Sequence, residues 1–183
     1  MPTILLKNGS SAHVTIRNAE PNDINALMRL NQKWQRSKLE DLKNGFVGAG
    51  FSRETFTELI NRRQVIVTDF QSQIVGYYLL NNFSKEGIIG LHEDFVHMLK
   101  QKGKIAKDAN ICVGGQVVVD TEFMGSGIRA LMLHNLVANM QGKCDFLFAT
   151  IAKDNPRSFT ANIRDGWTVV DEDDSLFFVV YQL

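Results

Sequence analysis

The sequence is poor in cysteine and proline, has no excess charge of either sign and contains no long hydrophobic run. It has 2 Cys and 3 Pro among 183 residues, and 44% of its residues are hydrophobic. This composition excludes a disordered or fibrous chain. Two cysteines cannot form a disulfide framework. Because both lie beside apolar residues, we expect Cys112 and Cys144 to be buried free thiols.

The absence of net charge also limits the partners. The 20 basic and 20 acidic side chains cancel, whereas a surface that binds nucleic acid needs an excess of Lys and Arg. The apolar run Ile4–Leu6 is too short for a signal peptide, and no stretch is long enough to span a bilayer. We therefore expect a cytoplasmic protein with no nucleic-acid or membrane partner. A small anionic ligand is still allowed.

The hydrophobic periodicity predicts strands and helices in the order β-α-α-β-β-α-β-α-β-α-β-β. The first strand is expected near residues 13–16, and helices begin at Pro21 and Ser52. A hairpin is expected over residues 64–80, with its turn at Gln71–Gln73. Strands and helices alternate in the second half. The pattern indicates one α/β domain over residues 1–183, with a mixed sheet covered by helices.

The most informative segment is a strand, a glycine turn and a helix. Residues 111–119 are rich in valine and contain Gly114-Gly115, a pair that indicates a bulge or the close approach of another group. Gly125-Ser126-Gly127 then precedes an amphipathic helix. Glycines allow positive φ and let an anion approach the backbone amides at a helix start. The segment therefore predicts a phosphate site, although a short Gly-x-Gly turn is a weak signal when it occurs alone.

Two motifs strengthen this prediction. Residues 117–131, with the sequence VVVDTEFMGSGIRAL, resemble the acyl-CoA-binding motif of the GCN5-related N-acetyltransferases (GNAT), in which an apolar strand and Gln/Arg-x-x-Gly-x-Gly/Ala precede a helix. The downstream residues Ala149–Ile151, Asn155, Ser158 and Asp165–Trp167 are similar to a second segment of that family. Only Ile111–Trp167 carries specific motifs, but the order of elements agrees over nearly the whole chain. The resemblance implies a mixed, mostly antiparallel sheet with helices on both faces.

The resemblance implies acetyl-CoA as co-substrate, and it assigns the cofactor contacts by position. The strand residues would pair with the pantetheine arm, the glycine turn would hold the pyrophosphate, and Asn155 would bind pantetheine or shape the thioester end. Arg157, in a basic group with Lys153 and Arg164, is a candidate for the 3′-phosphate. The implied cofactor residues are Val117, Val118, Val119, Phe123, Met124, Gly125, Ser126, Gly127, Ile128, Arg129, Asn155 and Arg157.

The chain departs from the family pattern at two positions. Glu122 stands where the pattern has Gln or Arg, so we expect its side chain to point away from the phosphates or to pair with a cation. Asn162 falls where the family often has a tyrosine that acts as general acid. An asparagine amide cannot protonate a leaving thiolate. Another residue or water must then do so, or the chain transfers acyl groups slowly or not at all.

Deprotonation of the amine nucleophile requires a base, and the strand over residues 111–119 and the turn after it offer candidates. On the predicted strand, Gly114, Gln116, Val118 and Asp120 share one face. Asp120 is the best-placed carboxylate and Glu122 is the next. The alternative is that Asp120 is a turn residue whose side chain binds loop amides.

A second polar cluster precedes the glycine turn in the sequence. It consists of His92, Glu93, Asp94 and His97, and it has no partner motif elsewhere. We interpret it as a solvated helix face and expect no metal site.

Two functional hypotheses follow. The first is an N-acyltransferase that moves an acetyl or other acyl group from acetyl-CoA to a primary amine by direct attack in a ternary complex. The second is a non-catalytic acyl-CoA-binding or sensing module, which Asn162 and Glu122 favour. A Rossmann domain needs a fingerprint that is missing after the first strand.

The acceptor, a small-molecule or peptide amine, is not specified by the residues. Dimers are common in the family, so a homodimer is one oligomeric state to test. The aromatic candidates for lining the acceptor site are Trp34, Phe46, Phe51, Tyr77 and Tyr78.

Overall fold

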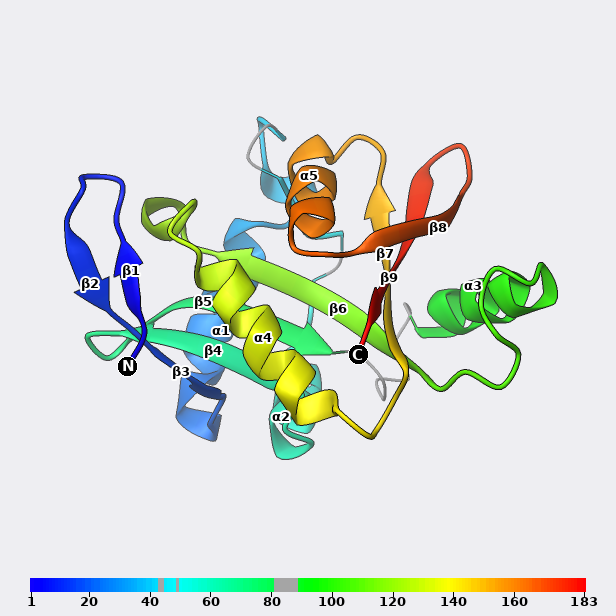
Figure 1. The fold of residues 1–183 in the computed structure, drawn as a ribbon. Coiled ribbons are helices and arrows are strands. Elements are labelled where there is room, and N and C mark those ends of the chain that lie inside the picture. Colours follow the sequence, from blue (N-terminus) through cyan, green and yellow to red (C-terminus); the bar gives the residue numbers. More distant parts are fainter. Residues whose placement is uncertain (43–44, 49, 81–88) are drawn as a thin grey trace. The chain divides into compact units, whose positions relative to one another are not determined.

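The computed structural model describes residues 1–42, 45–48, 50–80 and 89–183. Figure 1 shows the chain as a ribbon. Its elements are, in chain order, β1 (Thr3–Leu5), β2 (Ser11–His13), β3 (Thr15–Asn18), η1 (Pro21–Asp23), α1 (Ile24–Lys33), η2 (Arg36–Lys38), α2 (Arg53–Asn61), β4 (Val65–Phe70), β5 (Gln73–Leu80), α3 (Ile89–Gln101), β6 (Ile111–Val119), η3 (Thr121–Phe123), α4 (Ile128–Met140), β7 (Phe146–Ala152), α5 (Pro156–Arg164), β8 (Thr168–Glu172) and β9 (Leu176–Gln182).

The strands from β3 onward form a seven-stranded sheet in the order β3-β4-β5-β6-β7-β9-β8. The pairs β3–β4, β4–β5, β7–β9 and β8–β9 are antiparallel, whereas β6 and β7 are parallel. The predicted α/β class with a mixed, mostly antiparallel sheet is therefore confirmed. The apolar strand β7 is central, because it lies between β6 and β9.

The chain divides into two compact units. The first unit comprises Met1–Lys38, Val47–Leu80 and Gly115–Asn139, and the second comprises Leu39–Phe46, Asn81–Gly114 and Met140–Leu183. Neither unit is continuous in sequence. Strand β6 contributes residues 111–114 to the second unit and residues 115–119 to the first.

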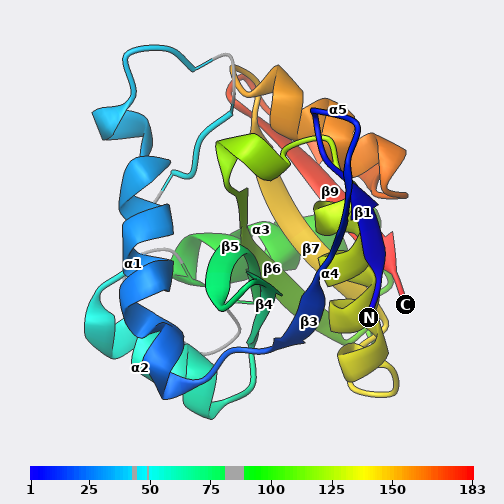
Figure 2. The same ribbon diagram turned by 90° about the vertical axis from the view of Figure 1, so that its left-hand side faces the viewer.

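In the first unit, helices lie on both faces of the sheet. The hydroxyl of Tyr77 on β5 accepts a hydrogen bond from Asn31 of α1, whereas a Cβ at the preceding Gly76 would lie 3.4 Å from the Met132 side chain of α4. Because adjacent strand residues face opposite sides, α1 and α4 cover opposite faces, as Figure 2 shows. Helix α2 begins as predicted, with the Ser52 side chain accepting a hydrogen bond from the Thr55 amide.

In the second unit, β7 and β9 carry an apolar core between two helices. Phe178 of β9 packs against Phe95 of α3, with 4.7 Å between the ring centroids. The adjacent Phe177 packs against Phe159 of α5, with 4.4 Å between centroids. Phe177 and Phe178 point to opposite faces of the strand, so α3 and α5 cover opposite faces of this part of the sheet. Helices on both faces are thus found in each unit.

The sequence prediction missed the N-terminal hairpin of β1 and β2. Each strand has three residues and buries only its central side chain, Ile4 or Ala12. Such short strands contain too few alternations to give a periodic signal. The predicted hairpin of β4 and β5 is confirmed, and its turn contains two residues, Gln71 and Ser72, with φ of 50° and 66°.

The glycine pair in β6 also has a structural reason. A Cβ at Gly114 would lie 3.2 Å from the ring of Trp167, so the close approach predicted for this pair is confirmed at Gly114. Both cysteines are buried free thiols, as predicted. Burial and the neighbouring Cys112 raise the pKa of the Cys144 thiol to about 12, so this thiol stays protonated at neutral pH.

None of the helices in the described ranges combines the length and the apolar character needed to cross a bilayer.

Candidate functional site

The turn after β6 is shaped by its own side chains. The Asp120 carboxylate accepts a hydrogen bond of 2.7 Å from the Thr121 amide and so caps η3. Phe123, at the end of η3, is buried and packs edge-on against Phe70 of β4. The chain then passes through Gly125 and Gly127, whose φ angles are 86° and 88°. These positive angles explain why glycine occupies both positions.

The glycine turn exposes a row of backbone donors. Within the described part of the chain, the amides of Gly125, Gly127 and Ile128 have no hydrogen-bond acceptor. A Cβ placed at either glycine would meet nothing within 4 Å. Ile128 begins α4, where the helix dipole adds a partial positive charge. Space, donors and dipole together form a site suited to an oxyanion such as a phosphate.

The strand that leads into this turn offers backbone groups on one edge. The Asp120 amide donates to the Val75 carbonyl of β5 at 2.7 Å. Because backbone groups of successive strand residues point to alternate edges, Val117 and Val119 direct theirs to the edge opposite β5. The register of β6 with β7 runs from Ile111–Phe146 to Val113–Phe148, and β6 continues beyond it to Val119. An extended ligand could pair with this edge.

Val117–Arg129 all lie in the first unit, whereas Asn155 and Arg157 lie in the second. Asn155 is buried and caps α5, its side-chain oxygen accepting from the Ser158 amide at 3.2 Å. Its amide nitrogen donates to the carbonyl of Phe46 at 3.1 Å, which ties the loop before α2 to the start of α5. Arg157 follows on the exposed first turn of α5. Their contribution to cofactor binding stays a prediction.

The carboxylate of Asp120 has two partners. Besides the Thr121 amide, it accepts from the ammonium of Lys33 on α1 at 2.5 Å. Partial burial would raise the pKa of Asp120, but these hydrogen bonds and the charges of Lys33 and Arg29 outweigh it, so the pKa lies below its usual value. The turn role proposed for Asp120 is observed directly. The alternative role as general base stays a prediction, and the lowered pKa makes this carboxylate a weak base.

The two departures from the family pattern differ in their surroundings. The Glu122 side chain is exposed on η3. Asn162 is buried, and its side-chain nitrogen donates to the Ser158 carbonyl one turn earlier in α5 at 2.8 Å. Its own carbonyl accepts from the Trp167 amide. The Asn162 side chain therefore serves the helix, and its backbone carbonyl serves the C-terminal turn.

The predicted solvated face of α3 is partly wrong. Glu93, Asp94 and His97 are exposed, but His92 is 8% exposed and its Nε2 lies 3.1 Å from the Thr150 hydroxyl of β7. Burial against Phe148 lowers the pKa of His92, so the neutral ring is favoured. The prediction failed because spacing alone does not show which side of a helix meets a neighbouring strand. In the ranges that the structure describes, no group of three or more His, Cys, Asp or Glu side chains could hold a metal ion.

Sequence reasoning also missed a buried polar network in the first unit. Asn31 of α1 donates to the Gln116 side chain of β6 at 2.8 Å, and the Tyr77 hydroxyl donates to the same oxygen at 3.1 Å. Asn31 also accepts from the Phe51 amide. Burial, partly offset by the bond from Asn31, raises the pKa of Tyr77 well above its usual range. Gln116 and Asp120 do share a face, as predicted, since both meet side chains of α1. The signal for Asn31 was its place among the apolar residues of a helical stripe.

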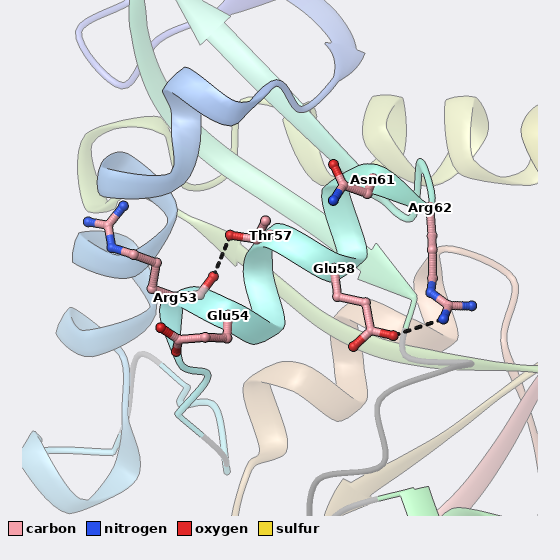
Figure 3. A pocket seen from close by; sticks show the side chains of 6 residues that line it. All are labelled: Arg53, Glu54, Thr57, Glu58, Asn61 and Arg62. Atoms are coloured by element: carbon pink, nitrogen blue, oxygen red, sulfur yellow. Dashed lines mark hydrogen bonds and ion pairs between the residues drawn. The ribbon is translucent and has the colours of Figure 1, made fainter.

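Three of the aromatic candidates, Trp34, Tyr77 and Tyr78, are buried core residues. A hollow of about 550 Å³ does occur on the surface of α2, as Figure 3 shows. Its side chains pair along the helix: Thr57 donates to the Arg53 carbonyl, and Arg62 pairs with Glu58 at 2.9 Å. Since all the lining residues belong to one helix and its end, this hollow is a polar helix surface and includes none of the predicted site residues.

No protein-family model matches the chain, and no curated protein matches it significantly. Solved structures do match its fold. A GNAT-family acetyltransferase from Listeria monocytogenes aligns with a TM-score of 0.66 at 14% identity, covering 100% of both chains. The PaiA N-acetyltransferase from Thermoplasma acidophilum, in complex with coenzyme A, has a TM-score of 0.66 at 14% identity and covers 93% of this chain and 99% of its own.

YncA from Salmonella typhimurium, a putative acetyltransferase with its cofactor acetyl-CoA, has a TM-score of 0.63 at 17% identity over 94% of this chain and 95% of its own. Because sequence identity is low, these matches show a shared fold. Fold and motif nevertheless agree, and the chain has the fold of the GCN5-related N-acetyltransferases.

Proposed function

We propose that this chain transfers an acetyl group from acetyl-CoA to a primary amine, and that residues 1–183 form one acyltransferase domain. The observation that carries the proposal is the row of amides at Gly125, Gly127 and Ile128 that have no acceptor in the described part of the chain, with open space at the two glycines before α4. Two of the matched structures contain coenzyme A or acetyl-CoA. A diphosphate is the part of that cofactor that fits this row of amides.

The other cofactor contacts follow from the strand and from α5. The backbone of Val117 and Val119 would pair with the pantetheine amides as an added strand. Asn155 keeps one hydrogen of its amide nitrogen beyond the bond to Phe46, and this hydrogen could reach a pantetheine carbonyl. Arg157 would pair with the 3′-phosphate, since a guanidinium and a phosphate form strong charge-assisted hydrogen bonds.

The chemistry is acyl transfer in one ternary complex. The amine nitrogen attacks the thioester carbonyl carbon, the oxygen takes up negative charge, and the carbon–sulfur bond then breaks to release CoA thiolate. The strand amide of Val117, on the edge opposite β5, would stabilise the oxyanion. An amine of lysine type has a pKa near 10.4 and is mostly protonated at neutral pH. A base, for which Asp120 and Glu122 are the candidates, or water must remove a proton before attack.

The side chain of Asn162 favours a second candidate function. Its nitrogen is engaged with the Ser158 carbonyl, and an amide donates no proton to a thiolate. A chain without an acid could bind acyl-CoA as a sensor without turning it over. Because a CoA thiolate is a fairly good leaving group, slow unassisted transfer is equally compatible with this residue.

Ligand binding and turnover separate these functions. We expect acetyl-CoA and CoA, but not NAD, to raise the midpoint of thermal unfolding, because only a ligand that binds the folded state stabilises it. Thiol release from acetyl-CoA is then measured with polyamines, amino acids, aminoglycosides and peptides. Release with one class of amine supports the transferase. Tight binding without release from any amine supports the sensor, and no stabilisation by either CoA species contradicts both.

A further inference from the structure

The N-terminal hairpin brings a lysine to the turn after β6. Lys7 lies in the turn between β1 and β2, where the Leu6 amide donates to Ser10 at 2.8 Å and Gly9 has a φ of 82°. The ammonium of Lys7 donates to the carbonyl of Thr121 at 2.8 Å. Figures 1 and 2 both show the hairpin beside the segment that joins β6 to α4. Residues 114 positions apart in sequence thus meet at η3, directly before the glycine turn.

The hairpin is anchored well enough to hold this lysine in place. Ile4 and Val14 are 3% and 1% exposed, and the Val14 amide donates to the Pro2 carbonyl. Buried side chains on β1 and directly after β2 fix the hairpin, so the turn that carries Lys7 has a defined position. The contact with Thr121 is therefore part of the fold of the first unit.

The hydrogen-bond partner of Lys7 does not neutralise the positive charge of the lysine. Thr121 offers a neutral carbonyl, and among the residues that the structure describes no carboxylate forms an ion pair with Lys7. One of the three ammonium hydrogens is used, which leaves two donors. An exposed lysine–carbonyl bond contributes little to folding. The Lys7 ammonium can therefore stabilise a bound anion more than it stabilises the folded chain.

The neighbouring sequence explains why a cation is useful here. Thr121 lies four residues before Gly125, the first glycine of the turn, and its carbonyl also accepts from the Met124 amide. Glu122 follows directly and brings a negative charge to the position where the family pattern has Gln or Arg. A carboxylate at that place repels a diphosphate. An ammonium on the preceding carbonyl offsets this repulsion.

We propose that Lys7 is a binding residue for the diphosphate of the acyl-CoA, supplied by the N-terminal hairpin and compensating for Glu122. The inference rests on the proposed function, since it assumes that the cofactor diphosphate occupies the amides of the glycine turn. It assigns a binding role to the hairpin, which the sequence pattern did not reveal.

The test compares Lys7→Met, Lys7→Arg and wild type by isothermal titration with CoA, 3′-dephospho-CoA and S-acetylpantetheine. Lys107→Met, which removes an exposed lysine of the second unit, is the matched control. We expect Lys7→Met to weaken binding of both diphosphate ligands about three- to tenfold, the range for one exposed charge-assisted contact. S-acetylpantetheine, which lacks the diphosphate, should bind both proteins equally. Lys7→Arg and Lys107→Met should bind CoA like wild type.

Each other result overturns the inference in a different way. Equal CoA affinity of Lys7→Met and wild type excludes the contact. An equal loss for S-acetylpantetheine shows that Lys7 only shapes η3. A loss for CoA but not for 3′-dephospho-CoA assigns Lys7 to the 3′-phosphate and not to the diphosphate. If wild type binds none of the three ligands, the proposed function fails, and the inference fails with it.

Discussion

The glycine turn and the acid–base positions of this chain respond differently to changes in sequence. In the turn, the groups that would hold the cofactor are backbone amides, so the exposed Glu122 can replace Gln or Arg without altering the donors. At residue 162, the expected chemistry belongs to a tyrosine hydroxyl, and asparagine removes it. A site built from the backbone survives divergence as long as its glycines remain, whereas a site built from side chains does not.

Asp120 belongs to both kinds of site, because its side chain shapes the turn and is also a candidate base. It ends the strand that leads into the turn, and its carboxylate is held by Lys33 and the Thr121 amide. Its structural role is therefore clear, and its role in proton transfer requires a separate test. The following predictions separate backbone from side-chain contributions.

The largest effect is expected for Gly127→Glu. At a φ of 88°, any side chain is strained, and a carboxylate there would fill the open space in front of the amides. Each hydrogen bond to a charged group contributes about 1.5–3 kcal/mol, so losing two weakens CoA binding roughly 100-fold or more. Isothermal titration with CoA measures the effect.

Gly103→Glu is the control for backbone strain. Gly103 also has positive φ, at 68°, with open space around it, and it lies in the second unit. This variant should bind CoA like wild type. Normal CoA affinity in Gly127→Glu would show that the diphosphate does not occupy the turn. The contrast between the glycine turn and the acid–base positions would then no longer hold.

A smaller effect is expected for Asn155→Ala. The substitution removes the cap of α5 and the bond to Phe46, and loss of an N-cap costs about 0.5–2 kcal/mol of unfolding free energy. Urea unfolding measures the change. Asn155→Asp keeps an oxygen for the Ser158 amide but loses the donor to Phe46. If Asn155→Asp is as stable as wild type, the tie to Phe46 contributes nothing.

Asn162→Ala tests the missing acid. It removes the bond to the Ser158 carbonyl, which contributes about 1 kcal/mol to stability. We expect thiol release to change less than about twofold, against the loss of about 10²–10⁴ that follows removal of an acid–base group. The rate is measured well below the melting temperature of the variant. A large fall in rate with the fold intact would give Asn162 a catalytic role and would weaken the contrast with the turn.

The smallest effect is expected for Asp120→Asn. Lys33 and Asp120 are partly exposed, so their pair contributes about 0.2–1 kcal/mol. Because the folded-state pKa of Asp120 is lowered, this stability is present above the unfolded pKa, about 3.9, and is lost as pH falls through the folded pKa.

The difference in unfolding free energy between wild type and Asp120→Asn should therefore be larger at pH 7 than at pH 3, as measured by urea unfolding. Thiol release at pH 7 reports on the other role. A fall in rate of about 10² or more in a folded variant would identify Asp120 as the base and would make it part of the side-chain site.

Much of the fold was readable from local patterns. The strand over Ile111–Val119 and the helix that follows the glycine turn, Ile128–Met140, occur where the sequence predicts them, because a valine-rich run and a glycine turn before a helix are local signals. The cap at Ser52 was readable as well, since a cap needs only its neighbours in sequence. The three-residue strands β1 and β2 were not, because packing on the rest of the unit creates them.

The linear sequence specified the glycine turn, since positive φ, open amides and a helix start are all properties of adjacent residues. Contacts between distant residues had to come from the folded chain. They include Lys7 on Thr121, Lys33 on Asp120, His92 on Thr150 and the amide network of Asn31 and Gln116. The physical reason is that a cap or a turn depends on local backbone geometry, whereas the partner of a side chain depends on which elements the hydrophobic core brings together.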